Sequence, residues 1–229
     1  MINPLDLYAK IESLIGFDAQ YELLYQNYLE ILNSLHVKRV LDVGCGNGKF
    51  LKHLKENSFE AFGIDRSAKM VERALALGVN ASTKELNEWE TQSFECVVAI
   101  ADVLNYISPL EINAFLDSVA EVLPKGGYFL CDINTLYGFE GVAEGVMCQD
   151  NGHEFLCVDA TFTNKELLTK IVLFEKEGSL YRKEEGSITQ YFHPLSLFKK
   201  LTHFKLLSTK PITLFGEEPD KTLLMFQKR

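Results

Sequence analysis

Residues 40–50 read VLDVGCGNGKF, and this stretch decides the fold. An apolar strand is expected to end near Asp42, glycines follow at positions 44, 46 and 48, and a helix is expected over 49–57. Because glycine has no Cβ, such a loop can turn sharply and let a flat ligand approach the main chain. The first N–H groups of the helix can then bind a polar or anionic group of that ligand. The stretch therefore predicts a strand, a ligand-binding loop and a helix.

Strand and helix signals alternate outward from this stretch. Apolar runs predict strands over 39–43, 60–64, 79–83, 94–100 and 128–133, and the segments between them predict helices over 49–57, 68–77 and 108–123. Ser108, Pro109 and Glu111 have the spacing of a capping box, which predicts the start of the third helix. This alternation is typical of an α/β fold, a doubly wound and mostly parallel sheet with helices on both faces.

The segments on either side have a different character. Apolar residues at helical spacing predict a short and a longer helix within residues 1–36. After residue 145, three strands are expected over 155–163, 167–176 and 180–191, close enough along the chain to pair antiparallel. A short helix over 194–202 and strands over 204–209 and 222–228 complete the chain. We therefore divide it into residues 1–36, 37–145, 146–192 and 193–229.

The composition disfavours several classes of protein. The chain has 23 Lys and Arg against 32 Asp and Glu, and a net charge of −9 disfavours binding to nucleic acid. No apolar run approaches the roughly 18 residues of a membrane helix, and no secretory signal is visible. Five widely spaced cysteines predict free thiols and a reducing, cytoplasmic compartment. Cys148, His153 and Cys157 lack a fourth ligand, so no metal site is expected.

The glycine spacing distinguishes two kinds of nucleotide-type ligand. A dinucleotide-binding loop has the pattern G-x-G-x-x-G, but Lys49 occupies the position of the third glycine. The pattern G-x-G-x-G after an acid resembles instead motif I of the class I S-adenosylmethionine-dependent methyltransferases. In that family an acidic residue ends the second strand, and Asp65 stands there in this chain. The resemblance implies that its carboxylate accepts hydrogen bonds from both ribose hydroxyls of the cofactor.

Two further segments carry the resemblance on to residue 134. Residues 94–107 (FECVVAIADVLNYI) are similar to the family's fourth strand, and residues 123–134 (LPKGGYFLCDIN) to its turn and fifth strand. The resemblance implies a Rossmann-like sheet of seven strands and S-adenosyl-L-methionine as the cofactor. The residues that it places at the cofactor are Asp42, Gly44, Cys45, Gly46, Asp65, Arg66, Leu86, Ala101 and Asp102. It places Asn105 and Tyr106 where the methyl group faces the substrate.

The resemblance also gives the four segments their expected roles. Residues 37–145 become the cofactor-binding core, and residues 193–229 complete its sheet. The helices of residues 1–36 and the antiparallel β insert of residues 146–192 are expected to close over the acceptor, the insert as a substrate lid. Methyl transfer to a small molecule by in-line displacement is then the expected activity, with no nucleic acid or membrane as partner. The oligomeric state is not indicated.

The adenine contact departs from the family pattern. Many members carry an Asp after the third strand that binds the adenine amine, and this chain reads NASTKEL at that place. Ser82, Glu85 or a main-chain amide near Leu86 are the candidates for the contact.

Several roles stay open at this point. A general base is needed only if the acceptor arrives protonated, and the candidates are Asp102, Tyr106 and His193, in that order. His193 could equally cap the helix that follows it or pack against Phe192, and Asp65 could stabilise the next helix through its dipole. Two alternative functions remain: an NAD(P)-dependent oxidoreductase, and a protein that binds S-adenosylmethionine without catalysis.

Overall fold

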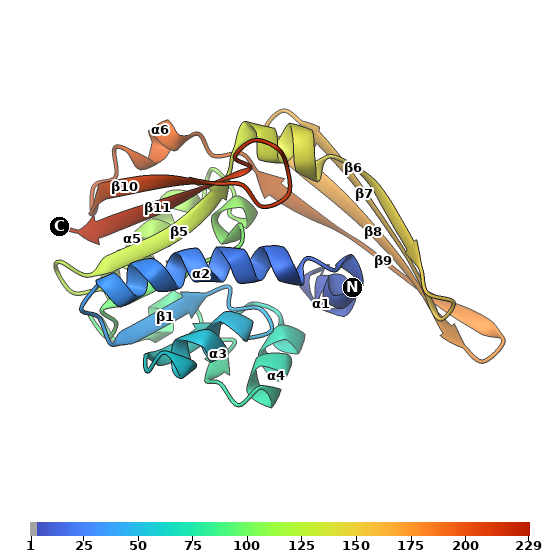
Figure 1. Cartoon of the computed structure of the whole chain (residues 1–229), viewed down its shortest axis with the longest axis horizontal. Helices are drawn as coiled ribbons and strands as arrows, with labels where there is room; N and C mark the ends of the chain where they lie inside the picture. The colour runs from blue at the N-terminus through green and yellow to red at the C-terminus, as the bar shows by residue number, and fades with distance from the viewer. Residues whose placement is uncertain (1–3) are drawn as a thin grey trace.

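Seven strands form the larger sheet of the computed structural model, which describes residues 4–229 (Figure 1). Their order is β10-β11-β5-β4-β1-β2-β3. Strands β1, β2, β3, β4 and β5 pair in parallel, whereas β11 runs antiparallel to both β5 and β10. The bounds are β1 Arg39–Val43, β2 Glu60–Ile64, β3 Ala81–Ser82, β4 Cys96–Ala99, β5 Tyr128–Asn134, β10 Phe204–Ile212 and β11 Lys221–Lys228. The predicted doubly wound, mostly parallel sheet is confirmed.

Helices cover both faces of this sheet, and each face has its own core. Helices α2 (Asp18–Ser34) and α3 (Lys49–Glu56) pack on one face, where Tyr28 and Phe50 are buried with Val98. Helix α5 (Ile112–Val122) packs on the other face with Phe129 and Val97. Successive residues of β4 thus enter different cores, which explains why the strand is apolar at every position. Helices α4 (Ala68–Ala76) and α6 (Leu195–Phe198) complete the layers.

The start of α5 differs from the prediction. The helix begins at Ile112, because residues 108–111 form a separate turn in which Glu111 N and Ile112 N both donate to Ser108 O at 3.0 Å. The Ser108 hydroxyl donates to the Glu111 carboxylate at 2.6 Å and does not cap the helix. The sequence of a capping box is present, but its two side chains bind each other.

A second sheet of four antiparallel strands projects from the core as a long twisted arm (Figure 1). It consists of β6 (Gly145–Asp150), β7 (Glu154–Thr163), β8 (Glu166–Glu177) and β9 (Leu180–Tyr191). The last three were predicted. Strand β6, whose side chains are mostly exposed, and the preceding helical turn η3 (Gly138–Ala143) were not.

Helix α1 (Pro4–Ile15) ties the arm to the core. Its apolar side packs Leu7 and Ile11 against Leu156, Ile171 and other residues of the arm. On the core side, Arg73 of α4 donates to Ala9 O at 2.5 Å. The two predicted N-terminal helices are confirmed, with Gly16 in a left-handed conformation between them (φ +78°). Residues 1–3 of the expected 1–36 segment lie outside the described residues.

The cysteines correct one prediction. Cys148 and Cys157 lie directly opposite each other on β6 and β7 and form a disulfide, so the expectation of free thiols is wrong for this pair. The register of the two strands brings them together, and that register was not predicted. Cys45, Cys96 and Cys131 are free and buried. Within residues 4–229, no group of three or more His, Cys, Asp or Glu side chains could hold a metal ion.

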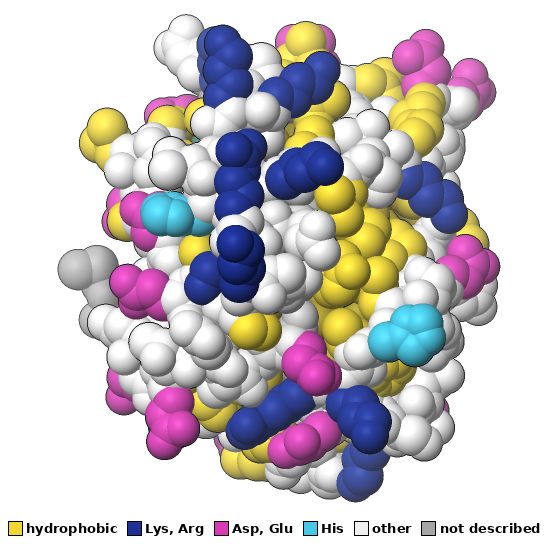
Figure 2. All heavy atoms as spheres, turned by 90° about the vertical axis from the view of Figure 1, so that its left-hand side faces the viewer, with side chains coloured by type: hydrophobic (Ala, Val, Ile, Leu, Met, Phe, Trp, Pro, Cys, Tyr) yellow, Lys and Arg dark blue, Asp and Glu magenta, His cyan; other side chains and the backbone are white. Residues whose placement is uncertain are grey.

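Two features are relevant to possible partners: the distribution of surface charge and the length and polarity of the helices. Figure 2 shows that Lys and Arg side chains form a row on one end of the molecule, beside a band of hydrophobic side chains, although the net charge of the chain is −9. Among the residues that the structure describes, no helix is long and apolar enough to cross a membrane.

Candidate active site

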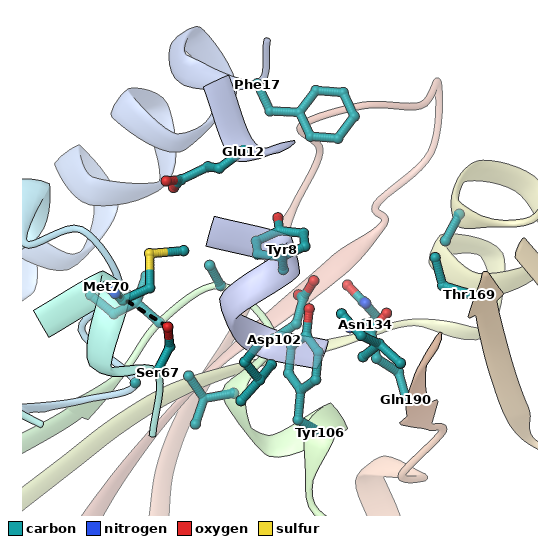
Figure 3. Close-up of a pocket in the computed structure, with 18 of the residues that line it drawn as sticks. Tyr8, Glu12, Phe17, Ser67, Met70, Asp102, Tyr106, Asn134, Thr169 and Gln190 are labelled. Carbon is teal, nitrogen blue, oxygen red and sulfur yellow. Dashed lines mark hydrogen bonds between the residues drawn. The ribbon is translucent and has the colours of Figure 1, made fainter. Parts of the chain in front are cut away.

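A cavity of about 770 Å³ opens at the carboxyl ends of β1, β2, β4 and β5. In open parallel sheets, ligands bind where the strand order reverses, and here this point lies between β1 and β4. Helices α1 and α2 and strands β6 to β9 supply the other walls. Figure 3 shows Tyr8, Asp102, Tyr106, Asn134 and Gln190 gathered in one part of it.

The three loop glycines have different tasks. All have positive φ, at +72°, +52° and +82° for Gly44, Gly46 and Gly48. A Cβ on Gly44 would lie 2.5 Å from Val103 Cγ2, and a Cβ on Gly48 would lie 2.7 Å from Ala74 Cβ, so both glycines permit close packing. A Cβ on Gly46 would meet nothing within 4 Å. Gly46 lines the cavity, so this part of the main chain is accessible to a ligand.

Asp65 joins the end of β2 to the glycine loop. Its Oδ2 accepts a hydrogen bond from Gly46 N at 2.9 Å, and its Oδ1 accepts one from Ser67 N at 2.8 Å. Burial raises the pKa of Asp65, against the opposing effect of these two N–H groups. Asp42 is buried nearby, and burial followed by the charge of Asp65 holds its pKa well above the usual range. The two carboxyl groups place acceptor oxygens beside the loop.

A strained turn follows β4. Ala101 and Asp102 both have positive φ, at +62° and +70°, which side chains other than glycine rarely adopt. The buried carboxylate of Asp132 holds the turn, since it accepts Ala101 N at 2.9 Å and Asp102 N at 3.1 Å. The Tyr28 hydroxyl of α2 donates to the same carboxylate at 2.8 Å. Asp132 was not predicted as a site residue, although an acid inside the apolar run FLCDIN was a signal.

Lys221 is a second residue that the sequence analysis missed. Its side chain is 3% exposed, and its Nζ contacts Asp102 Oδ1 and lies 2.8 Å from Asn134 Oδ1 and 3.7 Å from Asp132 Oδ2. Burial lowers the pKa of Lys221 to about 7. Lys221, Asp102 and Asn134 all line the cavity.

A loop before β11 closes another side of the cavity. Asp220 Oδ2 accepts hydrogen bonds from the main-chain N–H groups of Leu214, Phe215 and Gly216 at 3.0, 2.6 and 3.1 Å. This fixes the loop so that the rings of Phe215 and Phe17 meet at 4.8 Å between their centroids. Both rings line the cavity.

Most of the predicted site residues meet at this cavity. Those that line it are Asp42, Gly44, Cys45, Gly46, Asp65, Arg66, Leu86, Ala101, Asp102 and Tyr106. Of the adenine candidates, Glu85 and Leu86 line the cavity, and Glu85 lies 3.8 Å from the Arg66 guanidinium. Ser82 is not among the lining residues.

Asn105 and His193 lie outside the cavity lining. Asn105 is buried, donates to Tyr191 O at 2.8 Å and accepts from Asn134 N at 3.0 Å, so it joins β5 to β9. His193 Nε2 lies 3.1 Å from Leu104 O and 3.0 Å from Ile107 O, and burial lowers the pKa of its ring. Both side chains are occupied with structural contacts.

Replacing His193 by phenylalanine should therefore test a structural role. We expect His193→Phe to lower the free energy of unfolding by about 1–3 kcal/mol, because a buried and a part-buried carbonyl group lose their donor. Urea denaturation measures the change. His203→Phe is the control, since His203 is exposed and its ion pair with Asp117 is on the surface. Equal stability of the two variants would contradict the structural role.

The seven-stranded order, the glycine loop after β1 and the acid after β2 together define the class I methyltransferase fold. Residues 40–127 match a family model described as a methyltransferase domain. A Geobacillus sp. (strain WCH70) protein with a methyltransferase name is 28% identical over 155 residues, which are 64% of this chain and 62% of that relative. The chain thus spans less than two thirds of that relative's length.

Solved structures show the same fold over nearly the whole chain. A S-adenosylmethionine-dependent methyltransferase from Clostridium acetobutylicum has a TM-score of 0.79 at 18% identity, over 99% of both chains. The sugar N-methyltransferase KedS8 from Streptoalloteichus sp. has a TM-score of 0.74 at 17% identity, over 98% of this chain and 92% of that one. The arm and the N-terminal helices are therefore part of the shared architecture.

Proposed function

We propose that this chain transfers the methyl group of S-adenosyl-L-methionine to a small-molecule acceptor. The observation that carries the proposal is the joint between Asp65 and Gly46, where a carboxylate and an open main-chain segment face one cavity at the reversal of the strand order. Each Asp65 oxygen has a further lone pair for a ribose hydroxyl. The methyltransferase domain match over residues 40–127 supports the same cofactor.

The cavity residues fit the parts of such a cofactor. Asp65 would bind the ribose, and the main chain of Gly44, Cys45 and Gly46 would face the amino-acid portion. The main chain of Leu86 and the side chain of Glu85 are placed to meet the adenine. When bound, the cofactor supplies a methyl group already activated by its sulfonium. The chain's own task is alignment, which can contribute about 7–11 kcal/mol to lowering the barrier.

The acceptor end of the cavity supports a small, polar acceptor. Gln190 is buried and lines the cavity, and within residues 4–229 its side-chain amide makes no hydrogen bond. Thr169 and Asn134 face the same space (Figure 3). Apolar residues of the arm such as Val158 and Ala160 line the same cavity. The structural similarity to a sugar N-methyltransferase supports an acceptor of this size and polarity.

Asp102 is the proposed general base where the acceptor needs one. Its carboxylate is 21% exposed and faces the cavity. Tyr106 also lines the cavity, but burial raises the pKa of its hydroxyl far above neutrality, so it would donate a hydrogen bond. His193 is engaged with two carbonyl groups and does not compete.

Calorimetric titration tests the cofactor. We expect S-adenosylmethionine and S-adenosylhomocysteine to bind with one site each, because both carry the ribose that Asp65 would hold. Reduced nicotinamide dinucleotide is the control ligand and should not bind, since the loop lacks its third glycine. Absence of binding at millimolar S-adenosylmethionine would overturn the proposal. Transfer of labelled methyl groups into a metabolite extract would separate catalysis from binding alone.

A further inference from the structure

The first residue of β11, Lys221, places a buried ammonium at the edge of the cavity. Its side chain is 3% exposed, and its Nζ contacts Asp102 and donates a hydrogen bond to Asn134 Oδ1 at 2.8 Å. A buried charge is costly unless it is paired and hydrogen-bonded. Two acids face the Lys221 ammonium. Asp102 reaches it from the turn after β4, and Asp132 Oδ2 of β5 lies 3.7 Å from Lys221 Nζ.

The two acids are not equivalent. Asp132 is fully buried, and its oxygens already accept hydrogen bonds from Tyr28, Ala101 and Asp102. Asp102 has part of its carboxylate exposed to the cavity. Lys221 is therefore the group that compensates the charge which Asp102 would otherwise present to a ligand.

Lys221 also fixes the direction of an amide. Asn134 Oδ1 accepts from Lys221, so the Asn134 Nδ2 group points the other way. Within residues 4–229 no residue accepts a hydrogen bond from Nδ2. Figure 3 shows Asn134 beside Gln190, whose amide also lacks a hydrogen-bond partner among the described residues.

We propose that Lys221 is a positioning residue that withholds the charge of Asp102 from the cofactor's sulfonium and turns the Asn134 amide N–H toward the acceptor. This inference rests on the proposed function. It concerns the balance between S-adenosylmethionine, whose sulfur is cationic, and S-adenosylhomocysteine, whose sulfur is neutral. When Lys221 and Asp102 are paired, their charges cancel. This part of the cavity then prefers neither the cationic sulfur of S-adenosylmethionine nor the neutral sulfur of S-adenosylhomocysteine.

A charge cycle tests the proposal without a known acceptor. The ratio of the dissociation constants of S-adenosylhomocysteine and S-adenosylmethionine is measured by calorimetry for the parent, Lys221→Met, Asp102→Asn and the double variant. At about pH 6.5 the Lys221 ammonium, whose pKa is about 7, and the Asp132 carboxylate, whose pKa burial raises to about 6, are both mostly in their charged forms. We expect the ratio to rise about fivefold in Lys221→Met and to fall about fivefold in Asp102→Asn, in line with one unit charge at partial screening.

The double variant is decisive, because it removes both charges together. Its ratio should return to within about twofold of the parent's, since the local net charge is restored. A loss of packing alone would weaken both ligands and leave the ratio unchanged. Lys228→Met is the matched control: Lys228 lies on the same strand, donates to Leu123 O at 2.6 Å and does not line the cavity.

The outcomes separate the two proposals. One ratio for all four proteins, with both ligands bound, would overturn the role of Lys221 and leave the methyltransferase proposal standing. The role of Lys221 would also be overturned if the double variant had the same raised ratio of dissociation constants as Lys221→Met. A parent protein that binds neither ligand would overturn the proposed function and this inference with it.

Discussion

Replacing Asp132 by alanine is expected to lower the free energy of unfolding by about 3–5 kcal/mol, the range for breaking a buried charged network. The variant would leave the Ala101 and Asp102 N–H groups and the Tyr28 hydroxyl without their acceptor. It would also release a turn that holds two residues at positive φ. Urea denaturation followed by circular dichroism measures the change.

Two further variants give this expectation its controls. Asp117→Ala removes an acid from the exposed surface of α5 and should change stability by less than about 0.5 kcal/mol. Asp132→Asn keeps one acceptor oxygen and should lie between the parent and Asp132→Ala. If Asp132→Ala proved as stable as Asp117→Ala, the carboxylate would not be what holds the turn.

The core of the fold could be predicted because its signals are local. The glycines at 44, 46 and 48 sit between a buried strand and a helix, and the structure shows that packing against Val103 and Ala74 accounts for two of them. Strands β4 and β5 could be predicted because each is a continuous apolar run, which is also a local signal. Asp65 was found through the resemblance, which places an acid at the end of the second strand, one βαβ unit after the loop.

The rest depended on contacts between residues far apart in the chain. Asp132 accepts hydrogen bonds from a turn some 30 residues earlier in the chain. Lys221 contacts Asp102, which lies 119 positions earlier. Neither pairing leaves a pattern along the sequence. Asn105 was predicted at the substrate, but its amide joins two strands whose proximity only the fold creates. The capping-box prediction at Ser108 was wrong for a local reason: the Ser108 hydroxyl donates to the Glu111 carboxylate, and the helix begins only at Ile112.

The missed residues connect stability with the site. Tyr28 of α2 fixes Asp132, Asp132 fixes the backbone at Ala101 and Asp102, and Lys221 fixes the Asp102 side chain. The face of the sheet that α2 covers is thereby linked to the part of the cavity where we place the acceptor. A strained turn persists only where its surroundings determine it fully, and this chain of contacts supplies that constraint.

The second large effect is expected at Asp65. Asp65→Ala should weaken the binding of S-adenosylmethionine at least tenfold, because charge-assisted hydrogen bonds contribute about 1.5–3 kcal/mol each. The variant also removes the acceptor of Gly46 N, which orders the loop at the point where the ligand approaches. Calorimetry measures the dissociation constant. Glu72→Ala removes an equal charge from the exposed side of α4 and should leave the constant within about twofold.

The pH dependence separates the ribose contact from the loop contact. Burial raises the pKa of Asp65 in the free protein, and only the ionised carboxylate accepts hydrogen bonds at both oxygens. Affinity should therefore be full at neutral pH and fall as the pH drops through this pKa, which lies above the ordinary value of aspartate. Asp65→Asn keeps one acceptor for Gly46 N but cannot titrate, so its weaker affinity should not change in that pH window. An identical pH profile in the parent and in Asp65→Asn would mean that another group controls binding, and Asp42, whose pKa is raised by burial and by Asp65, would be the next to replace.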